Sequence, residues 1–301
     1  MDTTMKMESF TRTGQSRVQS CQKQIRQDIE QQWENAGIED NFIFFKVMQD
    51  KELCLELLRR IFPTFDIVAI KEPEQEKILA FTQDAKSIRM DLLVKEVADS
   101  GSKEIVRVYN IEMQIVSSSV LPMRSRYYQS MLDVGILERG AGYKELMPSF
   151  VIFICPKDVF GDDRIQYTFK NICEETGKPL GDNREIIFIN ASGSIGYIED
   201  GLQNFLDFMN NGVVSDKYTK LLNNEIEKFK MNKDVKGEYV KMITERSFLI
   251  AEGEEVGRRE TAKRMLKLGK LTHKEIVMCS GLTLEEVAAL AKELESELQT
   301  V

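Results

Sequence analysis

Apolar side chains recur at helical spacing between residues 40 and 62, and Pro63 ends this pattern. The spacing predicts one or two buried helices. Three segments rich in β-branched residues follow, at residues 67–70, 88–94 and 106–116, with polar or glycine-containing turns between them. We therefore expect three consecutive strands that form a meander.

The next amphipathic pattern covers residues 121–140 and predicts a helix closed by Gly140. Residues 148–155 are apolar almost without interruption, which predicts a strand buried on both faces of a sheet. A further strand is expected at residues 184–190 and a helix from about residue 198 to residue 210. Helix, three strands, helix and strand in this order indicate an α/β fold rather than a bundle or a sandwich.

Two changes of composition divide the chain into three parts. Residues 1–39 are polar and rich in glutamine, and they predict an arm or a short exposed helix. Residues 40–215 contain the α/β pattern, and residues 216–301 are helical almost throughout. We therefore predict a domain at residues 40–215 with a helical C-terminal extension.

The end of the chain has the pattern of a helix-turn-helix. Thr272 with Glu275 and Thr283 with Glu286 each have the form of a capping box, and Gly281 lies between the two expected helices. The second helix carries glutamates where a DNA-reading helix presents arginine, asparagine or glutamine, and DNA phosphates repel glutamates. We favour packing or oligomerisation, such as a homodimer, over DNA reading for this region.

Composition limits the chemistry that this chain can perform. It has 301 residues, of which 42% are hydrophobic and 30% are charged, as in a soluble globular protein. The net charge of -8, which lies almost entirely on residues 40–215, argues against bulk electrostatic binding to DNA or an anionic membrane, but it permits a local basic groove. His273 is the single histidine, so histidine-based triads, zinc sites and nucleases depend on it or are absent. We therefore expect chemistry based on carboxylates, amides, lysine or cysteine.

The sequence favours a cytoplasmic protein with no membrane segment. Its longest apolar run, residues 150–155, is far shorter than the roughly 20 residues that span a bilayer. The N-terminal residues are polar and lack the apolar region of a secretory signal. Five scattered cysteines without a Cys-x-x-Cys pair do not suggest a disulfide framework or a zinc site.

Two carboxylates form the strongest candidate for a chemical site. Asp91 lies within an apolar strand, and Glu112 lies in the next strand with Gln114 two positions later on the same face. Adjacent strands would bring Asp91 within reach of Glu112, where the two charges repel unless a hard divalent cation lies between them. This pattern predicts a metal-assisted phosphodiester hydrolase, although surface carboxylates near strand ends are common and give a plainer explanation.

Asp91 with Glu112-Met113-Gln114 resembles the D…E-x-K signature of the PD-(D/E)XK nuclease superfamily, in an E-x-Q variant. The sequence around these residues resembles the transposase-associated, recombination-promoting branch of that superfamily. The resemblance covers roughly residues 40–195 and includes the stretches at residues 41–54, 88–91, 109–114, 121–129, 140–146, 152–161 and 167–169. It implies a restriction-endonuclease-like core, a mixed sheet flanked by helices in αβββαβ order, which agrees with the order expected above.

The same resemblance implies an endonuclease that hydrolyses DNA with Mg²⁺ or Mn²⁺. Asp91 and Glu112 would bind the metal, the Met113 carbonyl would be a further ligand, and Asp40 or Asp50 could add another acid. Gln114 stands where most of the superfamily has lysine, and an amide can position water but supplies no positive charge. A different cation must then face the phosphate, and the candidates for phosphate or DNA contact are Lys86, Arg89, Lys95, Arg124 and Arg126.

Two other functions are compatible with this sequence. Gln114 and the acidic charge also fit a weak or inactive nuclease fold that acts as a nucleic-acid-binding or assembly module. An RNA or nucleotide phosphodiesterase on the same fold is the second alternative. Tyr127 and Tyr128 could stack on bases next to the metal, but packing into the core is the simpler expectation for them.

Overall fold

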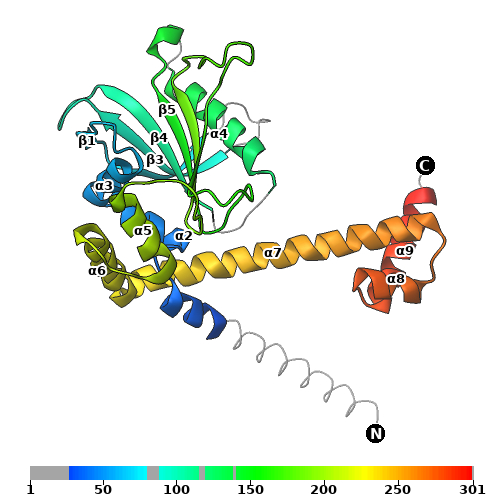
Figure 1. The fold of residues 1–301 in the computed structure, drawn as a ribbon. Coiled ribbons are helices and arrows are strands. Elements are labelled where there is room, and N and C mark those ends of the chain that lie inside the picture. The colour runs from blue at the N-terminus through cyan, green and yellow to red at the C-terminus, as the bar shows by residue number, and fades with distance from the viewer. Residues whose placement is uncertain (1–26, 80–87, 115–118, 138–139, 300–301) are drawn as a thin grey trace. The chain divides into compact units, whose positions relative to one another are not determined.

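A computed structural model of the chain describes residues 27–79, 88–114, 119–137 and 140–299 (Figure 1). One compact unit comprises residues 31–233, and a second comprises residues 234–299 with the described residues before residue 31. The domain limits at residues 39 and 215 expected from composition stay predictions. Helix α6 (Lys217–Met231), which follows the second of these limits, is part of the first unit.

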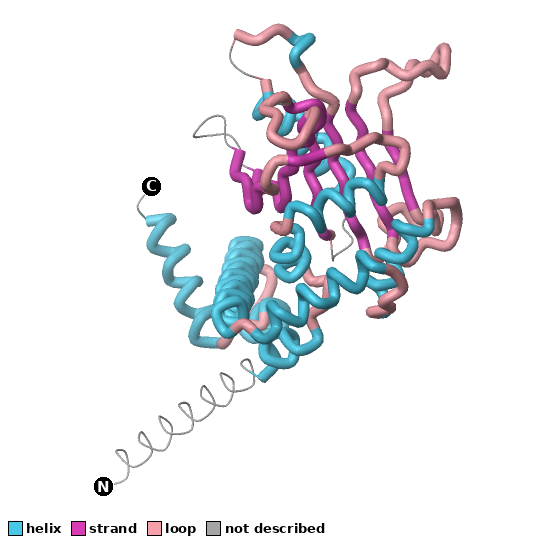
Figure 2. Tube along the Cα trace, turned by 90° about the vertical axis from the view of Figure 1, so that its left-hand side faces the viewer, coloured by secondary structure: helices cyan, strands magenta, loops and turns pink. Residues whose placement is uncertain are grey.

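A mixed sheet forms the centre of the first unit (Figure 2). Among the described residues it has seven strands in the order β1-β3-β4-β5-β7-β6, and β2 also pairs with β3. The pairs β3–β4 and β6–β7 are antiparallel, whereas β4, β5 and β7 run parallel. The strands are β1 (Ala69–Ile70), β2 (Glu74–Leu79), β3 (Ile88–Val97), β4 (Ile105–Met113), β5 (Ser149–Cys155), β6 (Gln166–Phe169) and β7 (Arg184–Asn190).

Helices cover both faces of this sheet. Helix α4 (Leu121–Ile136) packs on one face, and α3 (Lys51–Ile61) lies on the opposite face together with Phe62 (Figure 1). Helices α2 (Asn41–Met48), α5 (Asp200–Asn211) and α6 pack around α3, and a short 3₁₀ helix spans Tyr143–Glu145. The predicted α/β fold with a restriction-endonuclease-like αβββαβ order is therefore confirmed.

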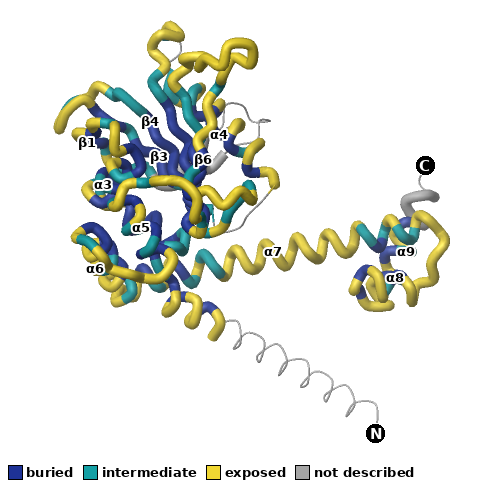
Figure 3. Tube along the Cα trace, viewed as in Figure 1, coloured by how far each residue is buried: buried dark blue, intermediate teal, exposed yellow. Residues whose placement is uncertain are grey.

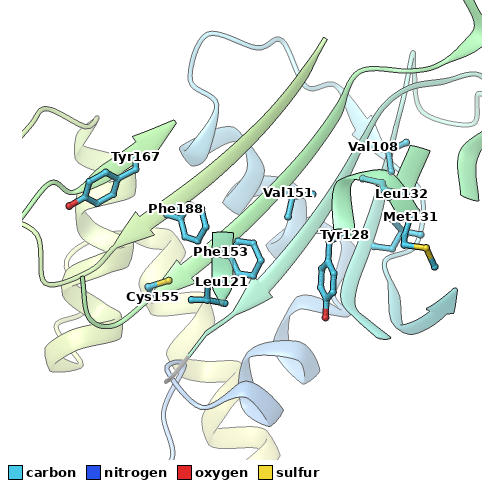
Figure 4. Packing of buried hydrophobic residues seen from close by; sticks show 11 residues of the cluster. Val108, Leu121, Tyr128, Met131, Leu132, Val151, Phe153, Cys155, Tyr167 and Phe188 are labelled. Atoms are coloured by element: carbon cyan, nitrogen blue, oxygen red, sulfur yellow. The ribbon is translucent and has the colours of Figure 1, made fainter. Parts of the chain in front are cut away.

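Strand β5 lies in the interior of the sheet, between β4 and β7. All seven of its residues are buried, as the continuous apolar run predicts. Phe153 of β5 stacks on Phe188 of β7 with ring centroids 4.9 Å apart (Figure 4). Four residues of α4 pack against the same face: Leu121 and Tyr128 near Phe153, and Met131 and Leu132 near Val108 of β4 (Figure 4). This cluster forms the core on which the N-terminal turns of α4 rest.

The opposite face has an aromatic core with one buried acid in it. Tyr109 of β4 stacks on Phe150 of β5, and Phe62 contacts both rings. The Tyr109 hydroxyl donates to Glu96 Oε2 at 2.5 Å, and Arg107 Nη1 donates to Glu96 Oε1 at 2.6 Å. These bonds satisfy both oxygens of a carboxylate that is almost fully buried.

The structure differs from the expected elements at the edges of the sheet. The strand predicted at residues 67–70 is reduced to two residues, and β2 and β6 were not predicted at all. Strand β2 has the sequence EQEKIL, which is too polar to stand out as a strand, and its hydrogen bonds with β3 decide its conformation. Helix α4 ends at Ile136, four residues before Gly140.

One glycine near the end of β7 allows two backbone segments to approach closely. A Cβ atom at Gly193 would lie 2.6 Å from the carbonyl carbon of Arg164 and 2.7 Å from the nitrogen of Ile165. We expect Gly193→Ala to lower the free energy of unfolding by about 1–3 kcal/mol, because backbone has to move to make room. Gly142→Ala is the matched control, since its Cβ would make only an ordinary contact with Glu145 at 3.7 Å. Equal urea midpoints for the two variants would contradict this prediction.

The second unit contains the expected pair of capped helices. It comprises α7 (Lys233–Leu268), α8 (His273–Ser280) and α9 (Leu284–Gln299). Thr272 and Glu275 form a capping box, and Gly281 ends α8 in the left-handed conformation. Most of α7 is exposed (Figure 3). Ala262 of α7, Ile276 of α8, and Val287 and Leu290 of α9 form a small core of this unit.

Candidate functional site

Asp91 and Glu112 lie side by side where strands β3 and β4 separate. The last backbone pair between the two strands at this end is Leu92 with Ile111. One residue further, the backbone N–H of Asp91 donates to the Glu112 side chain instead, with 3.1 Å from nitrogen to Oε1. The strand pairing therefore brings the two predicted carboxylates together on the face of the sheet that α4 covers.

The Glu112 carboxylate is fully buried and has several hydrogen-bond donors around it. Besides the Asp91 N–H, Asn110 Nδ2 donates to Oε1 at 3.0 Å and Arg124 Nη2 donates to Oε2 at 2.7 Å. A carboxylate accepts about four hydrogen bonds, so these three leave room for about one more ligand. Burial and, next, the charge of Asp91 raise the pKa of Glu112, which its three donors only partly offset. A second positive charge at this place would stabilise the ionised pair.

Among the residues that the structure describes, Arg124 is the positively charged side chain that bonds to Glu112. It lies in the first turn of α4, and its side chain is one third exposed. Besides its bond to Glu112, it donates from Nη1 to Gln114 Oε1 at 3.0 Å. Its guanidinium lies over the ring of Tyr128, 4.8 Å from the centroid. Burial lowers the pKa of Arg124, but the Glu112 charge and then Tyr128 more than offset this and raise it.

Met113 is the last residue of β4, and Gln114 follows it directly. The Gln114 N–H donates to the Ile154 carbonyl at 2.8 Å, which holds its backbone to the central strand β5. Its side-chain oxygen accepts from Arg124, so the amide faces the guanidinium. The buried Met113 side chain lies on the opposite face of the strand from Glu112 and Gln114. A role of the Met113 carbonyl as a metal ligand stays a prediction.

Of the other predicted cations, the two whose side chains are described, Lys95 and Arg126, have other surroundings. Lys95 shares a face of β3 with Asp91, but four residues of strand separate them by about 13 Å. Lys95 Nζ lies 2.5 Å from Glu74 Oε1 in an ion pair. Arg126 is exposed on α4 and lines a small cavity with Lys170 and Arg184. Lys86 and the side chain of Arg89 lie outside the described residues.

One residue at the site was not predicted from the sequence. Asn110 lies two positions before Glu112 on the same strand face, so the polar alternation of Asn110, Glu112 and Gln114 was the available signal. Its Oδ1 is buried and has no hydrogen-bond partner among the described residues. Tyr128 packs into the core as expected, and its ring also supports Arg124.

Three other acids accept hydrogen bonds that fix local structure. Asp40 accepts hydrogen bonds from the N–H groups of Phe42 and Ile43 at the start of α2, and Asp50 does the same at the start of α3. These caps explain why both helices begin where they do. Asp158 accepts from the Tyr167 hydroxyl and from two backbone N–H groups in the loop after β5.

The residues at the site fit a hard divalent cation. Within the described part of the chain, no group of three histidine, cysteine, aspartate or glutamate side chains could hold a metal ion. Asp91 and Glu112 supply two carboxylates, and the buried Asn110 Oδ1 has no hydrogen-bond partner among the described residues. A hard cation of the size of Mg²⁺ suits such a set, because it takes one or two carboxylates and completes its shell with water and substrate oxygens.

The sequence profile of the PD-(D/E)XK nuclease family transposases matches residues 42–256, which is more than half of the chain. The chain belongs to this family. No curated protein and no solved structure matches it. The match includes Asp91, Glu112 and Gln114, and it extends from the first residues of α2 into α7.

Membership of this family connects the chain with nuclease and transposase-associated functions. PD-(D/E)XK nucleases hydrolyse nucleic acids and generally use divalent metal ions, and membership of a nuclease family implies a DNA substrate. No helix in the described part of the chain is long and apolar enough to cross a membrane.

Proposed function

We propose that this protein is a Mg²⁺- or Mn²⁺-dependent DNA endonuclease of the recombination-promoting, transposase-associated type. The observation that supports it most is the close approach of Asp91 and Glu112. The buried Glu112 carboxylate accepts a hydrogen bond from the Asp91 backbone N–H where strands β3 and β4 separate. Arg124 offsets only one of the two negative charges. A divalent cation between Asp91 and Glu112 would offset the other, and this supports a metal site here.

The proposed roles follow from the positions of the side chains. Asp91 and Glu112 hold the metal, with the Met113 carbonyl as a further ligand. A bound divalent ion lowers the pKa of a water molecule and neutralises charge on the scissile phosphate. Asn110 keeps the Glu112 carboxylate oriented through its hydrogen bond to Oε1. Lys86, Arg89, Lys95 and Arg126 are proposed to contact the DNA backbone further away.

Chelation is the first test of this function. We expect EDTA to reduce cleavage of supercoiled plasmid DNA to the uncatalysed rate, and Mg²⁺ or Mn²⁺ in excess to restore it, because the ion is needed to activate water and to neutralise charge on the phosphate. Agarose gels that separate supercoiled, nicked and linear DNA measure both single- and double-strand cuts. Cleavage that is unchanged by EDTA would contradict the metal site.

The alternative, an inactive nuclease fold that binds nucleic acid or assembles with a partner, predicts a different set of results. It predicts no cleavage with either metal and no heat of Mg²⁺ binding in a calorimetric titration. A panel with plasmid DNA, single-stranded RNA and a simple phosphodiester distinguishes the DNA endonuclease from an RNA or nucleotide phosphodiesterase. We further propose a cytoplasmic protein whose helical C-terminal region forms a homodimer, and sedimentation of the full chain tests the dimer.

A further inference from the structure

The Arg124 guanidinium joins two residues of the site that come from one strand. One of its terminal nitrogens bonds to Glu112 Oε2 at 2.7 Å and the other to Gln114 Oε1 at 3.0 Å. The two acceptors lie two positions apart, Glu112 in β4 and Gln114 directly after it, and the planar fork of an arginine matches such a pair of oxygens. The guanidinium therefore has a defined position beside the carboxylates.

Packing holds Arg124 at this position. The ring of Tyr128, one turn later on α4, lies against the guanidinium at 4.8 Å, and the ring of Phe153 lies 5.9 Å from it. Both rings are buried in the core between α4 and the sheet. The backbone N–H of Arg124 bonds to the Val120 carbonyl at the start of α4, with Pro122 in the first turn. The side chain is thus supported along its length while one third of it faces solvent.

Phosphodiester hydrolysis needs positive charge at this place besides the metal. Water attacks phosphorus and forms a new O–P bond, the bond from phosphorus to the leaving oxygen breaks, water loses a proton to solvent, and the leaving oxygen gains one. Negative charge grows on the phosphate oxygens during this exchange. Arginine keeps its proton throughout, so it offers hydrogen bonds and charge but no proton transfer.

We propose that Arg124 supplies this positive charge and that Gln114 acts through it, as a positioning residue whose amide oxygen holds the guanidinium towards the scissile phosphate. The inference rests on the proposed nuclease function and assigns the charge to a helix residue instead of the strand residue at position 114. It makes two predictions: the charge can be moved between the two positions, and Gln114 has no effect once Arg124 is lost.

The test compares five full-length variants with the wild type: Arg124→Gln, Arg124→Lys, Gln114→Ala, the double variant Arg124→Gln with Gln114→Ala, and the double variant Arg124→Gln with Gln114→Lys. Lys220→Gln, which removes an exposed charge on α6, is the control for net charge. Circular dichroism and urea midpoints confirm folding, plasmid cleavage measures activity, and calorimetry measures Mg²⁺ binding.

We expect Arg124→Gln to lower the cleavage rate about a hundredfold or more, the loss that follows removal of one charge-stabilising donor. Arg124→Lys keeps the charge without the fork and should lose about tenfold. Gln114→Ala should lose about tenfold alone and nothing further in the Arg124→Gln background, which is the mark of two residues that act as one unit. Gln114→Lys should recover about tenfold or more in that background, whereas a purely structural arginine would not be rescued by a lysine elsewhere.

Mg²⁺ binding separates this inference from a role in organising the carboxylates. Arg124→Gln should bind Mg²⁺ at least as tightly as the wild type, since it removes a cation that competes for Glu112. A tenfold loss of Mg²⁺ affinity, no rescue by Gln114→Lys, or an Arg124→Gln rate within about threefold of the wild type would each overturn the inference.

Failure of the proposed function itself has a different result. A wild type that cuts no faster than Asp91→Asn would reject the nuclease, and the inference is then judged by DNA binding. Fluorescence anisotropy with a labelled duplex and Ca²⁺ measures this affinity. Weaker binding by Arg124→Gln than by Lys220→Gln would still support a phosphate contact, and equal binding would overturn it.

Discussion

Asp91→Asn is expected to lower the rate of DNA cleavage by about a thousandfold or more, equivalent to about 4 kcal/mol of transition-state stabilisation. Asparagine has nearly the shape of aspartate but lacks the charge that holds a divalent ion. The backbone N–H at this position still bonds to Glu112 Oε1, so the local geometry is retained. Calorimetry should show a parallel loss of Mg²⁺ binding.

Folding stability provides the independent measurement for this variant. Burial and, next, the charge of Asp91 raise the pKa of Glu112, and the second of these causes means that the two ionised acids repel each other in the folded protein. The free energy of unfolding should therefore not fall when Asp91 becomes neutral, although activity is lost. Asp99→Asn, an exposed aspartate just after β3, is the matched control and should keep full activity. Cleavage by Asp91→Asn at the rate of this control would reject the site.

Phe153→Ala is expected to lower the free energy of unfolding by about 3–5 kcal/mol. Its ring is fully buried at the centre of β5, stacks on Phe188 at 4.9 Å and contacts Tyr128 at 6.5 Å. Loss of the ring leaves a cavity below the first turns of α4, and neighbouring strands cannot close it without breaking their pairing (Figure 4). Urea unfolding followed by circular dichroism measures the loss.

The control for this variant is Phe169→Ala in the edge strand β6. Phe169 also contacts Phe188, at 5.9 Å, but it is nearly half exposed, so its loss should cost about 1 kcal/mol or less. Equal destabilisation by the two variants would show that the face covered by α4 is not the main core. Because Phe153 also lies near the Arg124 guanidinium, Phe153→Ala should reduce cleavage even under conditions where it stays folded.

The order of the core elements could be read from the sequence because it depends on local patterns. Strand β5 is apolar throughout and β3 and β4 are rich in β-branched residues, so each was predicted close to its actual position. The edge strand β2 was missed because its residues are polar and its partner, β3, provides the hydrogen bonds. Edge strands carry weak local signals, since only one side of them is paired.

The sequence likewise predicted one part of the candidate site, the acids on the strands, and not the other, the cation. The alternation of side chains along a strand was enough to place Glu112 and Gln114 on one face and to propose Asp91 as their neighbour. The same alternation could have added Asn110, which binds Glu112. The cation could not be chosen by such a rule, because the five candidate lysines and arginines come from different parts of the chain, and contacts between elements decide which of them reaches the carboxylates.

By itself the sequence determined the α/β class, the central buried strand and the pair of acids, all of which follow from periodicity within one element. Only the tertiary structure decided that Arg124, and not Arg126 two residues later, reaches Glu112 and Gln114. Side chains two positions apart on a helix point in nearly opposite directions. The rotation of α4 about its axis therefore determines which of the two arginines faces the site. The packing of Leu121, Tyr128 and Leu132 against the sheet fixes this orientation of α4. It is a contact between distant segments of the chain, so no local pattern predicts it.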